Sequence, residues 1–316
     1  MAEKIKIGVS SCLLGNEVRY DGGHRRDRYI ADILGAHVEL VPVCPEVEVG
    51  FGVPRETIRL EGLPEAPRLM TTRTRVDHTR RMLAWARRRV RELEKETLCG
   101  FIFKTRSPSC GVMRVKVHNG KSRPVSKGVG LFANAFMEHF PLLPVEEEEG
   151  LYDPAKRENF IERIFTLKRW REMLQEGRRF GHLVSFHTRH KLLILSHSER
   201  AYREMGRLVA RGKPRGTKAV FDAYEQLLMN ALSLNATVKK NVNVLQHMAG
   251  YFKKMLSMDE KKELQELIDR YHRSLVPLIV PVTLINHYVR KYDQAYLKEQ
   301  VYLNPHPVEL KLRNRV

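Results

Sequence analysis

The sequence has no long apolar run. None of its 316 residues lies in a stretch that approaches the roughly 20 apolar residues of a membrane-spanning helix. The first residues, 1–7, are charged and lack the apolar segment of a secretion signal. We therefore expect a cytoplasmic protein that does not enter a membrane.

Cysteine is scarce as well. Four cysteines in a chain of this length, without a secretion signal, argue against a disulfide-stapled fold. Metal ligation and reactive thiols are then the functions to consider, although a free buried cysteine is the ordinary alternative for each one. The sequence contains no Cys-x-x-Cys pair that would strengthen the case for a metal site.

Acidic residues are depleted in the second half. The net charge is +19, and residues 1–150 contain 25 Lys and Arg against 20 Asp and Glu, whereas residues 151–316 contain 31 against 17. A positive excess concentrated in one half indicates a polyanionic partner, because neutralising phosphates releases condensed counterions. The alternative is that the charge serves solubility alone. No protein partner is indicated.

The first half alternates between strands and helices. The predicted strands lie at 5–10, 38–43 and 100–104, and the predicted helices at 27–34 and 74–96. This alternation predicts an α/β fold with a mainly parallel, Rossmann-like sheet and flanking helices.

The pattern changes near residue 140. Prolines, the acidic run 146–149 and Gly150 favour a linker over residues 146–157. Beyond it, apolar periodicity predicts helices at 158–176, 182–210, 217–231, 237–254, 257–275 and 281–288. Ser257 and Glu260 form a capping-box pattern for the fifth of these. We expect an α/β domain over 1–145 and a basic C-terminal all-α domain over 158–316.

Three of the four cysteines occupy equivalent places. Cys12, Cys44 and Cys110 each follow a predicted strand, whereas Cys99 precedes one. The carboxyl ends of parallel strands form the ligand crevice of such a sheet, so the three thiols are expected to converge. Three thiolates can hold zinc or an iron–sulfur cluster with one metal position left open. Three buried cysteines that merely follow strands are the alternative.

Polar residues near these cysteines suit a substrate pocket. Gly15, Gly22 and Gly23 flank Arg19-Tyr20-Asp21 in a loop that can approach a ligand closely. Glu46 is a candidate general acid or base, with a helix or turn cap as the alternative. Ser107 and Ser109 can donate hydrogen bonds to sulfur or substrate, or cap a turn.

Four motifs in the first half carry a family resemblance. They are Ile7-Gly8-Val9-Ser10-Ser11-Cys12-Leu13-Leu14-Gly15, Arg19-Tyr20-Asp21-Gly22, Cys44-Pro45-Glu46 and Lys104-Thr105-Arg106-Ser107-Pro108-Ser109-Cys110-Gly111. In this order they resemble the bacterial thiouracil desulfidases over about residues 4–145. The resemblance implies a [4Fe–4S] cluster on Cys12, Cys44 and Cys110, whose fourth iron is open to the substrate's sulfur. It also implies that Glu46 and Ser107 are catalytic.

Further residues of these motifs are candidates for substrate binding. They are Ser11, Tyr20, Asp21, Lys104 and Ser109.

The second half is similar to a helical domain found fused to this desulfidase unit. The similar residues are Phe186-His187, His190-Lys191, His197, Asn243-Val244-Leu245-Gln246-His247-Met248, Pro277-Leu278-Ile279-Val280-Pro281 and Tyr302-Leu303-Asn304-Pro305-His306-Pro307. Such fused proteins resemble desulfidases that act on 4-thiouridine in transfer RNA (tRNA). The resemblance implies tRNA as the partner, and a non-redox conversion of 4-thiouridine to uridine with release of sulfide.

An enzyme that acts on a base must unstack it, and phosphate contacts elsewhere offset that cost. The basic second half is predicted to supply them. The candidate RNA-binding residues are Arg189, Lys191, Arg200, Arg203, Arg207, Arg211, Lys213, Arg215, Lys239 and Lys240.

His187, His190 and His197 share one helical face. A metal site is a possible interpretation, but no cysteine or carboxylate lies on the same stripe to complete it. Packing or phosphate contact is the favoured interpretation.

Two other functions are open at this point. One is desulfuration of free thiouracil or thionucleosides, for which the basic domain is unnecessary. The other is a non-enzymatic RNA-binding protein whose cluster is structural or senses redox state.

Overall fold

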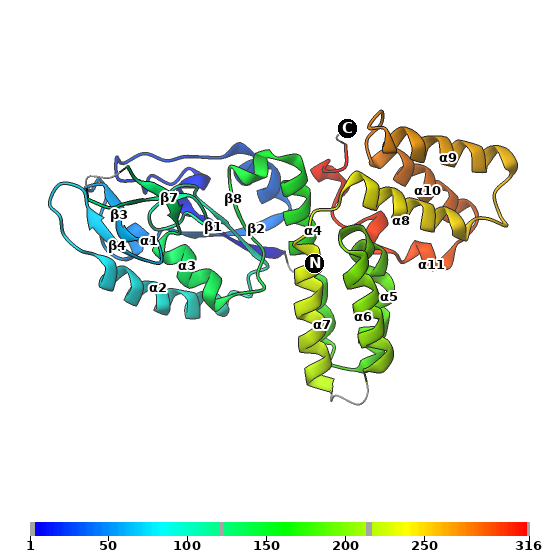
Figure 1. Cartoon of the computed structure of the whole chain (residues 1–316), viewed down its shortest axis with the longest axis horizontal. Coiled ribbons are helices and arrows are strands. Elements are labelled where there is room, and N and C mark those ends of the chain that lie inside the picture. Colours follow the sequence, from blue (N-terminus) through cyan, green and yellow to red (C-terminus); the bar gives the residue numbers. More distant parts are fainter. Residues whose placement is uncertain (1–3, 121–122, 213–216, 315–316) are drawn as a thin grey trace. The chain divides into compact units, whose positions relative to one another are not determined.

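The computed structural model describes residues 4–120, 123–212 and 217–314. The chain divides into two compact units, Met1–Asp153 and Pro154–Val316 (Figure 1). The division falls inside the segment 146–157. Among the described residues, no helix is long and apolar enough to cross a membrane.

A parallel four-stranded sheet forms the centre of the first unit. Its order is β2 (Val38–Val43), β1 (Ile5–Ser10), β5 (Gly100–Phe103) and β8 (Val145–Glu147), and every neighbouring pair is parallel. Ile7 and Val9 are fully buried. A Cβ on Gly8 would lie 2.2 Å from the Phe101 ring, so glycine is required where β1 approaches β5. The predicted α/β class is confirmed.

Helices cover this sheet through aromatic contacts. Helix α2 (Thr79–Glu94) packs on α3 (Leu131–His139), with the rings of Trp85 and Phe132 5.3 Å apart (Figure 1). Phe101 of β5 contacts Phe136 of α3 at 4.7 Å. The helix predicted at 27–34 is a π-helical turn, η2 (Tyr29–Ile33), followed by a 3₁₀ turn, η3 (Leu34–Ala36).

The sequence pattern does not predict the second sheet. Its order is β4 (Ala66–Thr71), β3 (Ile58–Leu63), β6 (Val115–His118) and β7 (Val125–Gly128), with β3–β4 and β6–β7 antiparallel. Its strands contain charged residues, such as Arg59 and Glu61, which pair with each other at 2.6 Å within β3. After β4 the chain turns back on this strand, and the N–H of His78 donates to the carbonyl of Leu69 at 2.8 Å, so the helix predicted from residue 74 begins only at Thr79.

The acidic run 146–149 is ordered. Glu147 ends the edge strand β8, and its Oε1 accepts the backbone N–H groups of Val112 and Met113 at 2.7 and 3.2 Å. Glu148 accepts from the N–H and hydroxyl of Thr105 at 2.7 and 2.9 Å. A 3₁₀ turn, η4 (Gly150–Tyr152), precedes the second unit. Glutamates of the segment 146–157 therefore fix the loop that follows β5 by accepting its hydrogen bonds.

The second unit is helical, as predicted. Its helices are α4 (Pro154–Gln175), α5 (Phe180–His197), α6 (Glu199–Arg211), α7 (Thr217–Leu232), α8 (Val238–Tyr251), α9 (Met258–His272), α10 (Ile279–Lys291) and α11 (Ala295–Lys298), followed by the 3₁₀ turns η6 (Val301–Leu303) and η7 (Val308–Leu310).

Two details of these helices test the sequence prediction. The predicted capping box of Ser257 and Glu260 is present at α9 and is confirmed. The prediction of a single helix over 182–210 is wrong, because α5 ends at His197 and a new helix starts after Ser198. Its side chain accepts the N–H of Ala201 at 3.1 Å and so starts α6 as a new helix.

Candidate active site

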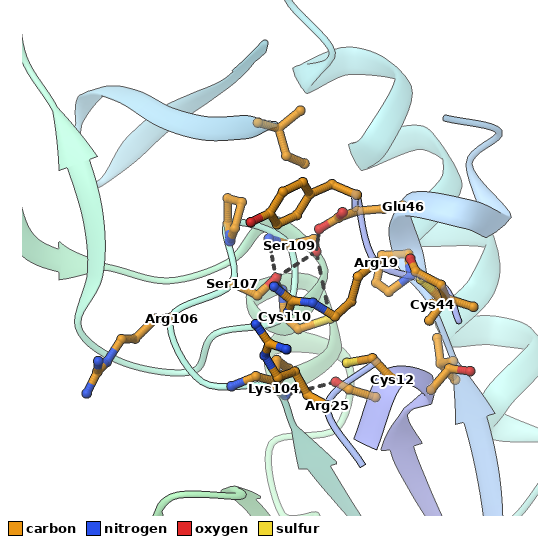
Figure 2. Close-up of a pocket in the computed structure, with 18 of the residues that line it drawn as sticks. Cys12, Arg19, Arg25, Cys44, Glu46, Lys104, Arg106, Ser107, Ser109 and Cys110 are labelled. Atoms are coloured by element: carbon orange, nitrogen blue, oxygen red, sulfur yellow. Dashed lines mark hydrogen bonds between the residues drawn. The ribbon is translucent and has the colours of Figure 1, made fainter. Parts of the chain in front are cut away.

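A cavity of about 360 Å³ opens at the carboxyl ends of the parallel strands in the first unit. Cys12 lies in the turn η1 (Ser11–Leu14) directly after β1. Cys44 follows β2 and is the N-cap of the short helix α1 (Pro45–Glu48). Cys110 lies in the loop after β5. All three line the cavity (Figure 2), whereas Cys99 is buried at the start of β5 and does not.

The surroundings of the three thiols oppose their ionisation in the absence of a cation. Burial, and then the neighbouring Cys44, raise the pKa of Cys12 to about 11. Burial also raises the pKa of Cys44, and that of Cys110 most strongly. Cys12 and Cys44 each add to the shift at Cys110, so the thiols lie near enough to affect one another. A bound metal group removes this cost, since thiolates are its natural ligands.

An unpaired donor also lies at this cavity. The Nε atom of Arg19 is buried and has no hydrogen-bond partner, although the Oδ1 atom of Asp21 lies 3.6 Å away. Lys104 and Arg19 both favour the thiolate of Cys12 electrostatically. The donors present are therefore three soft sulfur ligands with cations beside them. This set fits an anionic iron–sulfur group.

Both carboxylate oxygens of Glu46 accept hydrogen bonds. Oε2 accepts from Nε of Arg55 at 3.0 Å and from its Nη2, and Oε1 accepts from the hydroxyl of Ser109 at 2.7 Å. The Arg55 side chain is only 6% exposed, and it also donates to the carbonyls of Val18 and Gly52 at 3.0 and 2.9 Å. Arg55 thus fixes which oxygen of Glu46 faces the serines.

Sequence reasoning did not single out Arg55. It lies nine residues beyond Glu46 in an irregular segment, and no motif spacing relates the two. Only the tertiary structure places them together.

The two serines form a short chain of hydroxyls. Oγ of Ser107 lies 3.0 Å from Oγ of Ser109, and it accepts the backbone N–H groups of Cys110 and Ser109 at 3.1 and 3.3 Å. Since Ser109 donates to Glu46, the arrangement runs Ser107, Ser109, Glu46 across the cavity (Figure 2). Such a chain can carry a proton between the cavity and the carboxylate.

The other predicted substrate-binding residues divide into two groups. Ser11, Tyr20, Lys104 and Ser109 line the cavity. Asp21 does not, because its carboxylate accepts the N–H of Gly23 at 3.1 Å, which lowers its pKa and stabilises the loop itself.

The second unit places most of the predicted RNA-binding residues at its surface. Arg189, Arg200, Arg207, Arg211 and Lys239 are exposed. In α6 the arginines lie opposite the buried Met205 and Val209.

Five of the predicted RNA-binding residues stand apart. Lys240 donates to the carbonyls of His197 and Asn235 at 2.6 and 2.9 Å, so its ammonium group stabilises the fold. Lys191 lies 4.8 Å from the ring of Tyr296, and exposed Arg203 pairs with Glu199. Lys213 and Arg215 lie outside the described residues.

The three histidines of α5 are buried and serve packing. Burial lowers the pKa of His187 to about 4 and that of His190 to about 3. Their Nδ1 atoms lie 3.1 Å from the Tyr224 hydroxyl and 2.8 Å from the Phe186 carbonyl. Phosphate contact is excluded by this burial.

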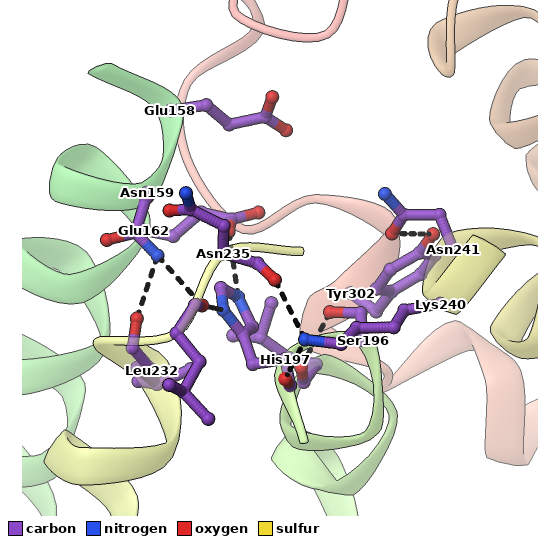
Figure 3. A network of polar contacts seen from close by, with 12 residues as sticks. Glu158, Asn159, Glu162, Ser196, His197, Leu232, Asn235, Lys240, Asn241 and Tyr302 are labelled. Atoms are coloured by element: carbon purple, nitrogen blue, oxygen red, sulfur yellow. Dashed lines mark hydrogen bonds and ion pairs between the residues drawn. The ribbon is translucent and has the colours of Figure 1, made fainter. Parts of the chain in front are cut away.

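His197 belongs to a buried ionic network (Figure 3). Its Nε2 lies 3.1 Å from Glu162, which also accepts from Arg313 at 3.0 Å. Arg313 pairs in turn with Glu158 at 3.3 Å. His306 lies close enough to both glutamates to suggest a metal site, but the guanidinium of Arg313 already binds both carboxylates. The network is structural.

Comparison with known proteins finds a matching family for each half. The family model of 2-thiouracil desulfurase matches residues 7–148. The Bacillus subtilis (strain 168) protein YbbK, which is uncharacterized, is 31% identical over 110 residues, covering 33% of this chain and 72% of YbbK. The chain belongs to the 2-thiouracil desulfurase family.

Other matches extend this result. A solved structure of a protein named [4Fe-4S]-dependent thiouracil desulfidase TudS is 31% identical, with 48% of this chain and 95% of that chain covered and a TM-score of 0.39. The model of a protein family of unknown function, DUF1722, matches residues 191–307. The uncharacterized Escherichia coli (strain K12) protein YbgA is 34% identical over 153 residues, covering 48% of this chain and 90% of YbgA. The desulfurase family therefore occurs here joined to a second, helical domain.

Proposed function

We propose that this protein is an iron–sulfur-dependent desulfidase that converts 4-thiouridine in tRNA to uridine with release of sulfide. The observation that carries the proposal is the cavity itself, where three thiols face a carboxylate held by Arg55 and a pair of serines. The relative TudS is named as a [4Fe-4S]-dependent enzyme, and the donor set of this chain fits such a cluster.

Cys12, Cys44 and Cys110 would hold the cluster. When bound, it supplies a soft Lewis acid that prefers the thiocarbonyl sulfur to oxygen and polarises the C=S bond. Three protein ligands would leave one iron of a [4Fe–4S] cluster without a cysteine and so available to the substrate.

The residues of the chain then provide acid–base chemistry. Glu46 takes a proton from water, directly or through Ser109 and Ser107, and the hydroxide attacks the ring carbon that bears sulfur. The tetrahedral carbon collapses to a carbonyl as the C–S bond breaks, and the sulfur leaves as sulfide. Carbon, sulfur and iron keep their oxidation states, so no oxidant or reductant is needed. Ser107, fixed by two backbone N–H groups, positions the water or the substrate.

Charge at the cavity favours a nucleotide over a free base. Arg19, Arg25 and Lys104 line the cavity. Lys104 is paired with Glu148 and Arg19 lies near Asp21, whereas the exposed guanidinium of Arg25 donates only to the carbonyl of His24 among the described contacts. A neutral thiouracil does not use these cations, whereas the phosphates that flank a nucleotide in RNA do. The excess of basic residues over residues 151–316 points to the same class of substrate.

Anaerobic reconstitution followed by nucleoside analysis of thiolated tRNA tests the proposal. We expect loss of 4-thiouridine, a matching gain of uridine, and sulfide in proportion. Turnover of free thiouracil alone would instead support a free-base desulfidase, the activity for which TudS is named. A cluster that binds but releases no sulfide with either substrate would leave a non-enzymatic RNA-binding protein.

A further inference from the structure

The exposed side of α2 carries a row of cations. We call Arg80, Arg87, Arg88, Arg91 and Lys95 the basic stripe. All five are exposed. At 3.6 residues per turn they fall within roughly 100° of the helix circumference, and from Arg80 to Lys95 the row is about 22 Å long.

Most of the stripe lacks an acidic partner. In the ranges that the structure describes, no ion pair or side-chain hydrogen bond involves Arg80, Arg87, Arg91 or Lys95, and Arg88 lies 3.7 Å from Glu92 with both side chains largely exposed. Helix α2 contains six arginines and two glutamates, a net charge of +4, whereas the first 150 residues together have a net charge of +5. The helix therefore holds most of the positive excess of that half.

Only the C-terminal end of the stripe is favoured by its helix, because Arg91 lies in the last turn of α2, where the helix dipole attracts a cation. Arg87 and Arg91 are four residues apart, as are Arg91 and Lys95, and like charges at that spacing repel. Arg80 lies in the first turn, where the helix dipole disfavours a cation and where α2 has no acidic residue. A row of cations that repel one another and mostly lack acidic neighbours indicates a partner of opposite charge.

The surface along the stripe is hollowed. One depression of about 510 Å³ is lined by residues that include Arg80, Ala84 and Arg87, and a second of about 330 Å³ is lined by residues that include Ala84, Arg87 and Arg91. Since both share Ala84 and Arg87, they join over the small side chain of Ala84. A strand-like polyanion can follow such a track.

Two other arginines of α2 tie the stripe to the active-site segment. Arg89 pairs with Glu48 of α1 at 2.9 Å, and Glu48 accepts the N–H of Cys44 at 2.9 Å. Arg81 lies 5.6 Å from the ring of Phe51. A ligand bound along the stripe is therefore held in a fixed position relative to Cys44, whatever the second unit does.

We propose that the basic stripe binds the sugar–phosphate backbone of the RNA substrate. The choice of RNA rests on the proposed function. Arginine forks match phosphate oxygens, and a row of about 22 Å is long enough to contact several successive phosphates of one strand. An anionic membrane does not fit, because the apolar side of α2, with Met82, Trp85 and Val90, is buried within the unit. The first unit thus contributes its own RNA contacts.

The test compares two triple variants of the full-length apoprotein. Arg87→Gln/Arg91→Gln/Lys95→Gln neutralises the stripe, and Arg28→Gln/Lys116→Gln/Lys127→Gln removes the same charge from exposed positions elsewhere in the unit. Binding of labelled tRNA is measured by fluorescence anisotropy over a range of salt. We expect the stripe variant to bind roughly tenfold or more weakly, with the slope of log K against log salt reduced by about 2 to 3. The control should stay within about twofold of the wild type.

Each other outcome overturns the inference. Wild-type affinity and slope in the stripe variant would show that α2 does not touch RNA, while leaving the proposed function intact. An equal loss in both variants would reduce the effect to net charge. No tRNA binding by the wild type would end both proposals. After reconstitution, the visible absorbance of the cluster should be the same in all three proteins, and a loss confined to the stripe variant would assign the stripe to the integrity of the active site instead.

Discussion

The two units contain the same kinds of polar side chain and use them differently. In the first unit, Glu46, Arg55 and Ser109 meet at a cavity beside three buried thiols and an arginine Nε without a partner. In the second, His197, Glu162 and Arg313 meet inside the core and satisfy one another (Figure 3). The first set lies beside three thiols that can hold a metal group, whereas in the second the guanidinium of Arg313 already binds both carboxylates.

The largest expected effect comes from the thiols. Cys12→Ala, Cys44→Ala or Cys110→Ala should each abolish the visible absorbance of the reconstituted cluster, because each removes one of three ligands. Cys99→Ala is the matched control, since Cys99 is buried but does not line the cavity. An equal loss of absorbance in the control would refute the assignment of the ligands.

Glu46 tests whether the cavity performs acid–base chemistry. Glu46→Gln keeps the size of the side chain but removes the base, so kcat for 4-thiouridine in tRNA should fall about 10²- to 10⁴-fold while the cluster absorbance is retained. Glu39→Gln, an exposed carboxylate on β2, should leave kcat unchanged. A fully active Glu46→Gln enzyme would remove Glu46 from the mechanism.

Substitution of Arg313 tests whether the ionic network of the second unit is structural. Arg313→Met leaves Glu158 and Glu162 buried without their cation, so the free energy of unfolding of this unit should fall by about 3 to 5 kcal/mol. Denaturant titration followed by circular dichroism measures it. Arg290→Met, at an exposed position, should change it by less than about 0.5 kcal/mol. The cluster absorbance of the reconstituted protein should survive Arg313→Met, because the three cysteines all lie in the first unit.

The smallest effect concerns pH. Burial lowers the pKa of His190 to about 3 and that of His187 to about 4, from an ordinary 6.5. Both depressed values mean that the unfolded chain binds more protons, so their contribution to stability is present above about pH 6.5 and is lost as the pH falls toward 3 to 4. At pH 5 the loss from His190 is about 2 kcal/mol.

Urea unfolding at pH 7.5 and pH 5 measures this loss, and His190→Gln is the comparison. The variant should be less stable at pH 7.5 but should show a smaller difference between the two pH values. The same pH dependence in both proteins would place the titrating group elsewhere.

Much of the fold follows from local pattern. The strands 5–10 and 38–43, the capping box at Ser257 and most helices of the second unit could be predicted because each depends on neighbouring residues only. The second sheet could not be predicted, because β3 and β4 contain charged residues, some of whose partners lie outside the strands. Glu61 of β3, for example, pairs with Arg75. Ser198 is a recognisable N-cap residue, but the apolar periodicity continues through it and hides the helix break.

The candidate site also has features that the sequence predicts and features that only the tertiary structure sets. Three cysteines after three strands predict a convergence, because a parallel sheet brings the carboxyl ends of its strands to one edge whatever lies between them. The order of strands and cysteines along the chain is enough to specify that much. The tertiary structure alone places Arg55 beside Glu46, links Ser107 to Ser109, supports the Thr105 loop through Glu148 and turns Asp21 away from the cavity. These are contacts between loops, whose paths are set by packing and by the hydrogen bonds that each backbone group finds, and not by a periodic pattern along the chain.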